Sequence, residues 1–140
     1  MKKNLLITLL LSLMLFGCGA NKVITNVRYT DDRPDRYSLF EEVSDHNAWK
    51  IIYQKKTDVM YVVSNGKYNR GVFTLMVDAN GNPLLYDENI TDHQFVVVDQ
   101  AYGYMIVYHE QTNVMYSVTS GYNQGVFTLL VDADGKPLLY

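Results

Sequence analysis

The chain has 140 residues, with 12 basic and 15 acidic side chains and a net charge of −3 at pH 7. This mild acidity argues against nucleic acid, which needs a basic face, and it gives no reason to expect binding to anionic lipid headgroups. The length allows one compact domain or two very small ones. Twelve tyrosines favour β-structure with exposed aromatic area, since tyrosine is common in strands and at wet binding surfaces.

The first seventeen residues have the pattern of a secretory signal. Lys2 and Lys3 give a positive start, and residues 5–16 are apolar except for Thr8 and Ser12. A run of this length is too short to cross a membrane as a permanent helix. We therefore predict a signal peptide over residues 1–17.

The lone cysteine of the chain, Cys18, follows this run in the order Leu15-Phe16-Gly17-Cys18. That order resembles the lipobox of bacterial lipoproteins, which implies diacylglycerol and palmitate on Cys18 and a location at the extracytoplasmic face of the cell membrane. Phe16 departs from the smaller residue usual before the glycine. An uncleaved signal anchor and an ordinary secretory peptide are the alternatives. Leu15 fits an ordinary signal peptidase poorly, and a single cysteine has no disulfide partner within the chain.

Residues 18–36 carry little apolar periodicity and end in a charged stretch around Pro34. Such a composition predicts a tether between the lipid and a folded unit. The anchor would then hold the protein at the membrane with room to clear the headgroups.

The rest of the chain is a tandem repeat. Residues 68–86 return as residues 122–140, and fifteen of these nineteen positions are identical. Upstream the offset between matching residues is 55 rather than 54, so the first copy has one extra residue within 65–67. We predict two β units, at 37–86 and 92–140.

Each unit is expected to consist of short strands and turns. Apolar or aromatic runs of strand length alternate with polar breaks suited to hairpins. The Asn-Gly and Asp-Gly pairs accept the positive φ of tight turns. The expected strands or closing segments are 49–53, 59–63, 72–77 and 84–86, then 104–108, 114–118, 126–131 and 138–140.

The fold class is therefore all-β, formed by two antiparallel units of about 50 residues. A unit of this size buries too little surface to be comfortably stable alone. Because no metal site or disulfide is evident, the two copies are expected to pack as a pseudo-symmetric pair. Two independent mini-barrels are the alternative, which the short linker at residues 87–92 disfavours.

Three motifs occur in both copies: Thr-x-Val-Met-Tyr, a Gly-containing loop with Tyr-Asn-x-Gly-Val, and Asp-x-x-Gly-x-Pro-Leu-Leu. Through them both units resemble domain of unknown function 6440, a small bacterial and phage-borne family. Asp58 and Asn113 stand where the first family motif usually has glycine, a change that a turn accepts. The resemblance covers about 100 of the 140 residues. It implies no activity, cofactor or catalytic residue.

Candidate catalytic and metal-binding groups do not form convincing sets. The turns beginning at Asp78 and Asp132 lack the further oxygen ligands of an EF-hand, so we interpret them as hairpin turns. The three histidines do not recur between the copies and lack zinc-like spacing, which predicts solvated surface histidines. Glu41 and Glu42 are adjacent, so in a strand they point to opposite faces. We therefore predict no enzyme, no metal and no cofactor.

The recurring polar and aromatic loops are the candidate binding residues. Tyr68 and Asn69 precede Gly71, and Tyr122 and Asn123 precede Gly125. One interpretation is structural, since a bulge or tight turn uses glycine and a side-chain-bonded asparagine. The functional interpretation is a small aromatic and amide platform for a sugar or peptide, presented twice on loops.

The sequence thus predicts a membrane-tethered, non-enzymatic binding or interaction module. Its expected partners are the membrane, through the lipid anchor, and a cell-wall glycan or an envelope protein. The alternative is an inhibitory or phage-exclusion lipoprotein that acts at the cell envelope.

Overall fold

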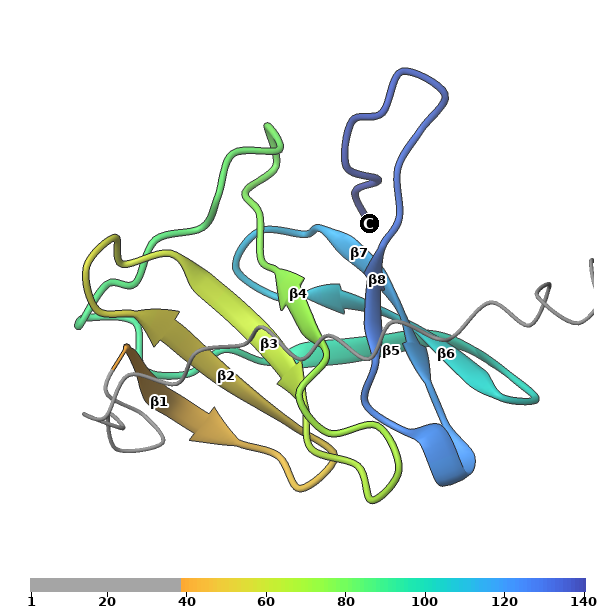
Figure 1. Cartoon of the computed structure of the whole chain (residues 1–140). Coiled ribbons are helices and arrows are strands. Elements are labelled where there is room, and N and C mark those ends of the chain that lie inside the picture. Colours follow the sequence, from red (N-terminus) through yellow and green to blue (C-terminus); the bar gives the residue numbers. More distant parts are fainter. Residues whose placement is uncertain (1–38) are drawn as a thin grey trace, which may run out of the picture. The chain divides into compact units, whose positions relative to one another are not determined.

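The computed structural model describes residues 39–140, which form two four-stranded antiparallel sheets and one short 3-10 helix (Figure 1). This confirms the all-β fold class. The expected signal peptide, Cys18, the tether and the first two residues of the first unit lie outside the described residues. Within residues 39–140, no helix is long and apolar enough to cross a membrane.

The two sheets divide the described chain into halves of the same architecture. Sheet 1 has the strand order β1-β2-β3-β4 and sheet 2 the order β5-β6-β7-β8. Sheet 1 consists of β1 (Phe40–Asp45), β2 (Trp49–Gln54), β3 (Met60–Ser64) and β4 (Phe73–Leu75). Sheet 2 consists of β5 (Phe95–Ala101), β6 (Tyr104–His109), β7 (Met115–Thr119) and β8 (Phe127–Leu129), with the 3-10 helix η1 (Gly121–Asn123) between its last two strands.

The strand register repeats along with the sequence. Trp49 pairs with Ser64 on β2 and β3, and Tyr104 pairs with Thr119 on β6 and β7, each 55 residues later. Both first strands carry a bulge, after Glu42 in β1 and after Val97 in β5. These first strands were not among the strands expected from the sequence, because only two apolar positions in each matched between the copies.

The turns explain the departures from the family motif. Asp58 and Asn113 have φ values of 57° and 58°, a region that glycine adopts freely and that aspartate and asparagine tolerate better than other residues. In the later turns the carboxylate of Asp78 accepts backbone N–H groups from Asn80 and Asn82. Asp132 does the same for residues 134 and 136. These aspartates are therefore turn-forming residues.

The closing segments of the two units form less strand than expected. Leu85 makes a single antiparallel bridge to Val59, and Leu139 makes one to Val114. Tyr86 stacks on Tyr53 with ring centroids 4.1 Å apart, and Tyr140 stacks on Tyr108 at 4.5 Å. Pro83 and Pro137 add a second bridge in each unit, so each closing segment is held by two isolated bridges and one aromatic stack.

The two sheets share one core, and they pack head to tail. The buried cluster joins Val62 and Val77 of the first unit to the inner face of sheet 2. That inner face consists of Phe95, Val107, Tyr116, Val118, Phe127 and Leu129. It packs against the inner face of sheet 1, which consists of Trp49, Ile51, Met60 and Val62. The two inner faces are not counterparts in the repeat, so the contact is heterologous rather than two-fold symmetric.

Three contacts fix this packing where β4 and β8 meet (Figure 1). The Thr74 hydroxyl donates to the backbone oxygen of Phe127 at 2.7 Å. The backbone N–H of Val77 donates to the Tyr116 hydroxyl at 3.3 Å. Trp49 meets Phe127 edge to face, with ring centroids 5.3 Å apart.

Equivalent residues therefore differ in burial. The aromatic triad of Phe95, Tyr116 and Phe127 lies on the inner face of sheet 2, and Phe127 is 4% exposed. Its counterpart, the triad of Phe40, Tyr61 and Phe73, has the same edge-to-face contacts, but Phe73 is 48% exposed. We call the side of sheet 1 that carries Phe40, Tyr61 and Phe73 its outer face.

The prediction of surface histidines is wrong for His93 and His109, which are buried. Nδ1 of His93 lies 3.2 Å from Nε2 of His109, and the two rings stack beside Phe95. His109 replaces Gln54 of the first unit, so the repeat gave no signal for this pair. Burial and the neighbouring His93 lower the pKa of His109 from 6.5 to about 4, and burial also lowers the pKa of His93.

Acid should therefore destabilise the fold in a defined pH window. The pKa of His109 in the folded state, about 4, lies below its unfolded value of 6.5. The fold therefore keeps its full stability above pH 6.5 and loses stability as the pH falls toward 4. The shift in the pKa of His109 corresponds to about 3 kcal/mol of unfolding free energy. At His93, hydrogen bonds with Gln111 and Ile90 and the charge of Asp92 oppose the lowering of the pKa. The measurement is the melting temperature between pH 7 and 4.

His109→Gln is the matched control, since glutamine occupies this position in the first unit. The variant should lose most of the pH dependence in this window. An unchanged pH profile would show that the histidine pair does not control acid stability.

Candidate binding groove

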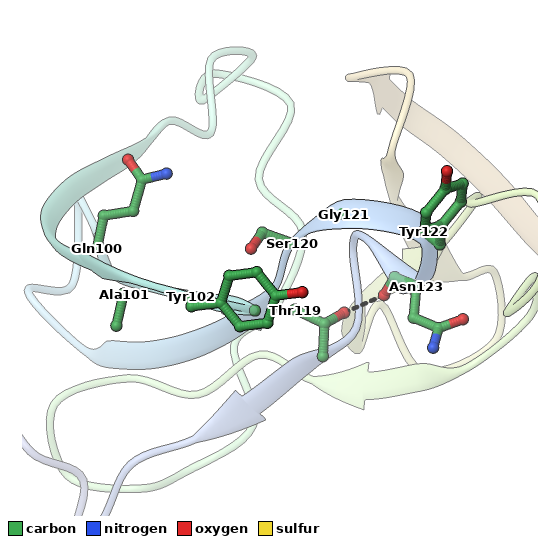
Figure 2. Close-up of a pocket in the computed structure, with 9 residues that line it drawn as sticks. Gln100, Ala101, Tyr102, Thr119, Ser120, Gly121, Tyr122 and Asn123 are labelled. Carbon is green, nitrogen blue, oxygen red and sulfur yellow. Dashed lines mark hydrogen bonds between the residues drawn. The ribbon is translucent and has the colours of Figure 1, made fainter.

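An open groove lies at the end of sheet 2, between the β5–β6 hairpin and the segment that follows β7 (Figure 2). Its volume is about 600 Å³. The hairpin contributes residues 100–103 and the second segment contributes residues 119–123.

Backbone hydrogen bonds and glycines give the groove its walls. The N–H of Ser120 donates to the oxygen of Gly103 at 2.9 Å, which joins the two segments. Gly103 and Gly121 have φ values of +91° and +79°, so each turns the chain in a way that disfavours larger residues. The Thr119 hydroxyl donates to the backbone oxygen of Asn123 and accepts the N–H of Val126. The groove is therefore formed by two backbone segments that hydrogen bonds join.

Three exposed tyrosines surround this region. Tyr102 is fully exposed, Tyr122 is 85% exposed and Tyr68 is 63% exposed. The rings of Tyr68 and Tyr122 meet edge to face with centroids 6.3 Å apart. Lys67 lies over the Tyr68 ring at 5.5 Å from its centroid.

The structure brings the four sequence-predicted binding residues into one region. Tyr68 and Tyr122 adjoin each other, and Asn123 lines the groove. The side-chain amide of Asn69 donates to the backbone oxygens of Asn123 at 2.6 Å and Gln124 at 3.1 Å. The two Tyr-Asn loops thus form one continuous surface, in which Asn69 holds the loops together and the other three residues face solvent.

Sequence reasoning missed the hairpin wall of the groove. Tyr102 corresponds to Asn47 in the first unit, so a search for recurring residues did not select it. A usable signal was the pair Tyr102-Gly103 between two largely apolar strands, where a glycine turn leaves the neighbouring aromatic side chain in solvent.

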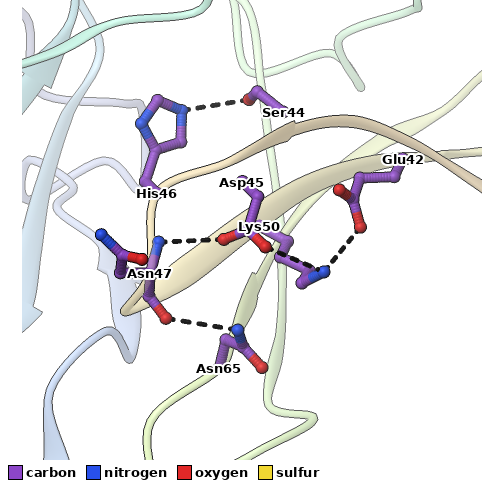
Figure 3. Close-up of polar contacts among 7 residues, drawn as sticks. All are labelled: Glu42, Ser44, Asp45, His46, Asn47, Lys50 and Asn65. Carbon is purple, nitrogen blue, oxygen red and sulfur yellow. Dashed lines mark hydrogen bonds and ion pairs between the residues drawn. The ribbon is translucent and has the colours of Figure 1, made fainter.

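The corresponding hairpin of sheet 1, between β1 and β2, carries a network of polar contacts (Figure 3). Lys50 forms ion pairs with Glu42 at 2.7 Å and Asp45 at 3.1 Å. These hydrogen bonds raise the pKa of Lys50 and lower that of Asp45. Asp45 also accepts the N–H of Asn47, whose backbone oxygen accepts a hydrogen bond from Asn65.

Loop 2, which we define as residues 123–125, fills the first unit's equivalent of the groove. A Cβ on Gly66 would lie 2.7 Å from the backbone oxygen of Gln124, and a Cβ on Gly125 would collide with the backbone oxygen of Ala48. Loop 2 therefore lies directly against Ala48, Gly66 and Asn69. The counterparts of these three residues in the second unit are Gly103, Gly121 and Asn123, which line the open groove.

The chemistry available in the groove is recognition by aromatic faces, hydroxyls and amides. Among residues 39–140, no group of three or more His, Cys, Asp or Glu side chains could hold a metal ion. The His93 and His109 pair lies in the core beside Phe95. The exposed tyrosines around the groove favour a binding surface.

Comparison with known proteins adds one finding. No curated protein and no solved structure matches the chain. Residues 39–86, which contain all of sheet 1, match the family model described as a family of unknown function, DUF6440.

Proposed function

We propose that the protein is a bacterial lipoprotein anchored by Cys18 at the extracytoplasmic face of the cell membrane, and that its β units form a non-enzymatic binding module. The anchor rests on the sequence pattern of residues 1–18. The observation that carries the binding role is the groove with Tyr102 and Tyr122 at its walls and Tyr68 beside it. Large aromatic side chains left in solvent next to ordered backbone are typical of recognition sites.

We also propose that the second unit is a further copy of the DUF6440 domain. The support is the repeated register of its sheet, including the bulge, and the fifteen identical residues in the nineteen-residue closing segment. The expected partners are a cell-wall glycan or an envelope protein, since both present groups that tyrosine and asparagine can bind.

The anchor is tested by replacing Cys18. Cys18→Ser should abolish incorporation of radiolabelled palmitate and release the protein from the membrane fraction, because serine cannot accept the diacylglycerol. A serine variant that is labelled as strongly as the wild type would exclude the lipoprotein assignment.

The groove is tested with Tyr102→Ala and Tyr122→Ala. Both tyrosines are exposed, so each alanine variant should melt within a few degrees of the wild type. Capture of purified peptidoglycan fragments and of envelope proteins by the full chain should fall about tenfold, as expected for the loss of one aromatic contact. Tyr102→Phe and Tyr122→Phe keep the stacking face and are the controls, with most of the capture retained. Undiminished capture by both alanine variants would show that the groove is not the binding site.

A further inference from the structure

We infer that the partner of the groove is a second copy of this chain, so that molecules associate head to tail by repeating the contact between their own two units. This inference rests on the proposed binding role of the groove and names its partner. It uses two surfaces: the outer face of sheet 1, defined above, and the outer face of sheet 2, which carries Tyr104, Ile106, Met115 and Ser117 together with the groove.

One aromatic triad of the repeat is left without a covering sheet. Phe95, Tyr116 and Phe127 are covered by the inner face of sheet 1. The matching triad of Phe40, Tyr61 and Phe73 has the same internal geometry but remains on the surface, with Phe73 half exposed. Exposed contiguous apolar side chains of this kind mark interaction sites.

The complementary surface is also present, on the outer face of sheet 2. The residues of sheet 1 that cover the buried triad have counterparts on the outer face of sheet 2. Trp49, which contacts Phe127, corresponds to Tyr104, which is 45% exposed. Thr74, whose hydroxyl bonds the backbone of Phe127, corresponds to the exposed Thr128. The partner's Tyr104 and Thr128 can therefore contact Phe73 as Trp49 and Thr74 contact Phe127.

The groove at the end of sheet 2 has a counterpart in the first unit. In the first unit the equivalent space is filled by loop 2, the Asn123-Gln124-Gly125 segment. The corresponding segment of the first unit, Asn69-Arg70-Gly71, has the same Asn-x-Gly pattern. A Cβ built on Gly71 meets nothing within 4 Å, so its surface is free, whereas the same atom on Gly125 meets Ala48. Loop 69–71 of one copy thus fits the groove of the next.

Heterologous contacts that do not close produce chains rather than dimers. Two differences between the units weaken the contact. Ser117, on the outer face of sheet 2, stands where sheet 1 has Val62 of the buried cluster. Sheet 1 has Glu42 and Lys50 where sheet 2 has Val97 and Met105, and covering that ion pair is costly. We therefore expect association weaker than the internal packing and favoured by confinement to a membrane.

The test is sedimentation velocity on the full chain, purified in a mild detergent, over a range of concentrations. The wild type should sediment faster as its concentration rises, with dimers and larger species. Phe73→Glu places a charge on the outer face of sheet 1, and Tyr104→Glu places one on the outer face of sheet 2. Each variant alone should therefore be monomeric. Their equimolar mixture should form dimers and nothing larger, because one intact face remains on each. Leu75→Glu and Thr128→Glu replace them if either variant fails to fold, and Ile90→Glu, an exposed change outside both sheets, should associate like the wild type.

A wild type that is monomeric at every concentration would overturn the inference. So would an equimolar mixture that stays monomeric. Self-association of either variant alone would also overturn it, because it would indicate a two-fold contact through the face that the variant keeps. A monomer that still captures peptidoglycan through Tyr102 and Tyr122 would leave the proposed function standing. A wild type that shows neither capture nor association would contradict both the proposed function and this inference.

Discussion

Phe127→Ala should destabilise the protein far more than Phe73→Ala, although the two phenylalanines occupy the same place in the repeat. Phe127 is 4% exposed and packs against Trp49, Phe95 and Tyr116. Truncation of a buried phenylalanine costs about 3–5 kcal/mol, which is a large part of the stability of a small domain. Phe73 is 48% exposed, so its truncation should cost about 1 kcal/mol.

The measurement is thermal unfolding of the two variants beside the wild type in dilute solution. Phe127→Ala should lower the melting temperature by roughly 15 °C or more, and Phe73→Ala by about 5 °C. Equal losses would mean that the outer face of sheet 1 is covered in solution as fully as the inner face of sheet 2.

The second large effect is expected at Gly125. Gly71 and Gly125 have φ values of +85° and +89°, so alanine is strained at both positions and should cost about 1–2 kcal/mol. At Gly125 the new Cβ would also collide with the backbone oxygen of Ala48, whereas at Gly71 it would meet nothing within 4 Å. Because a backbone atom cannot move aside easily, Gly125→Ala should cost about 3 kcal/mol or more.

Gly71→Ala is the control for backbone strain, and the difference between the two variants reports the contact of loop 2 with the first unit. Melting temperatures give this difference directly. If both glycine variants lose the same stability, loop 2 does not lie against Ala48 in solution.

The fold class and most of the strands were predictable from the sequence because they depend on local patterns. The alternation around Tyr61 and Tyr116 marked central strands, and the Asp-Gly and Asn-Gly pairs marked turns, which the φ values of Gly81 and Gly135 confirm. The first strands, β1 and β5, were missed because only two apolar positions in each matched between the copies, and the bulge in each also shifts the alternation that identifies a strand.

The candidate site was predictable only in part. Recurrence selected Tyr68, Tyr122 and their asparagines, and the structure places these residues together. Tyr102 was missed because it has no counterpart of its own kind, and recurrence carries no information about residues that differ between copies. The buried histidine pair was missed for the same reason.

The sequence by itself determined that the chain repeats one β unit, where its strands and turns lie, and which residues recur. It could not determine which of two identical residues is buried. Phe73 and Phe127 have the same neighbours along the chain and in their own sheets. Their burial differs because the sheets pack through opposite faces, and such a contact must cover one copy of each surface while it leaves the other free. Only the tertiary structure decided this, because it arises between the units and not within either of them.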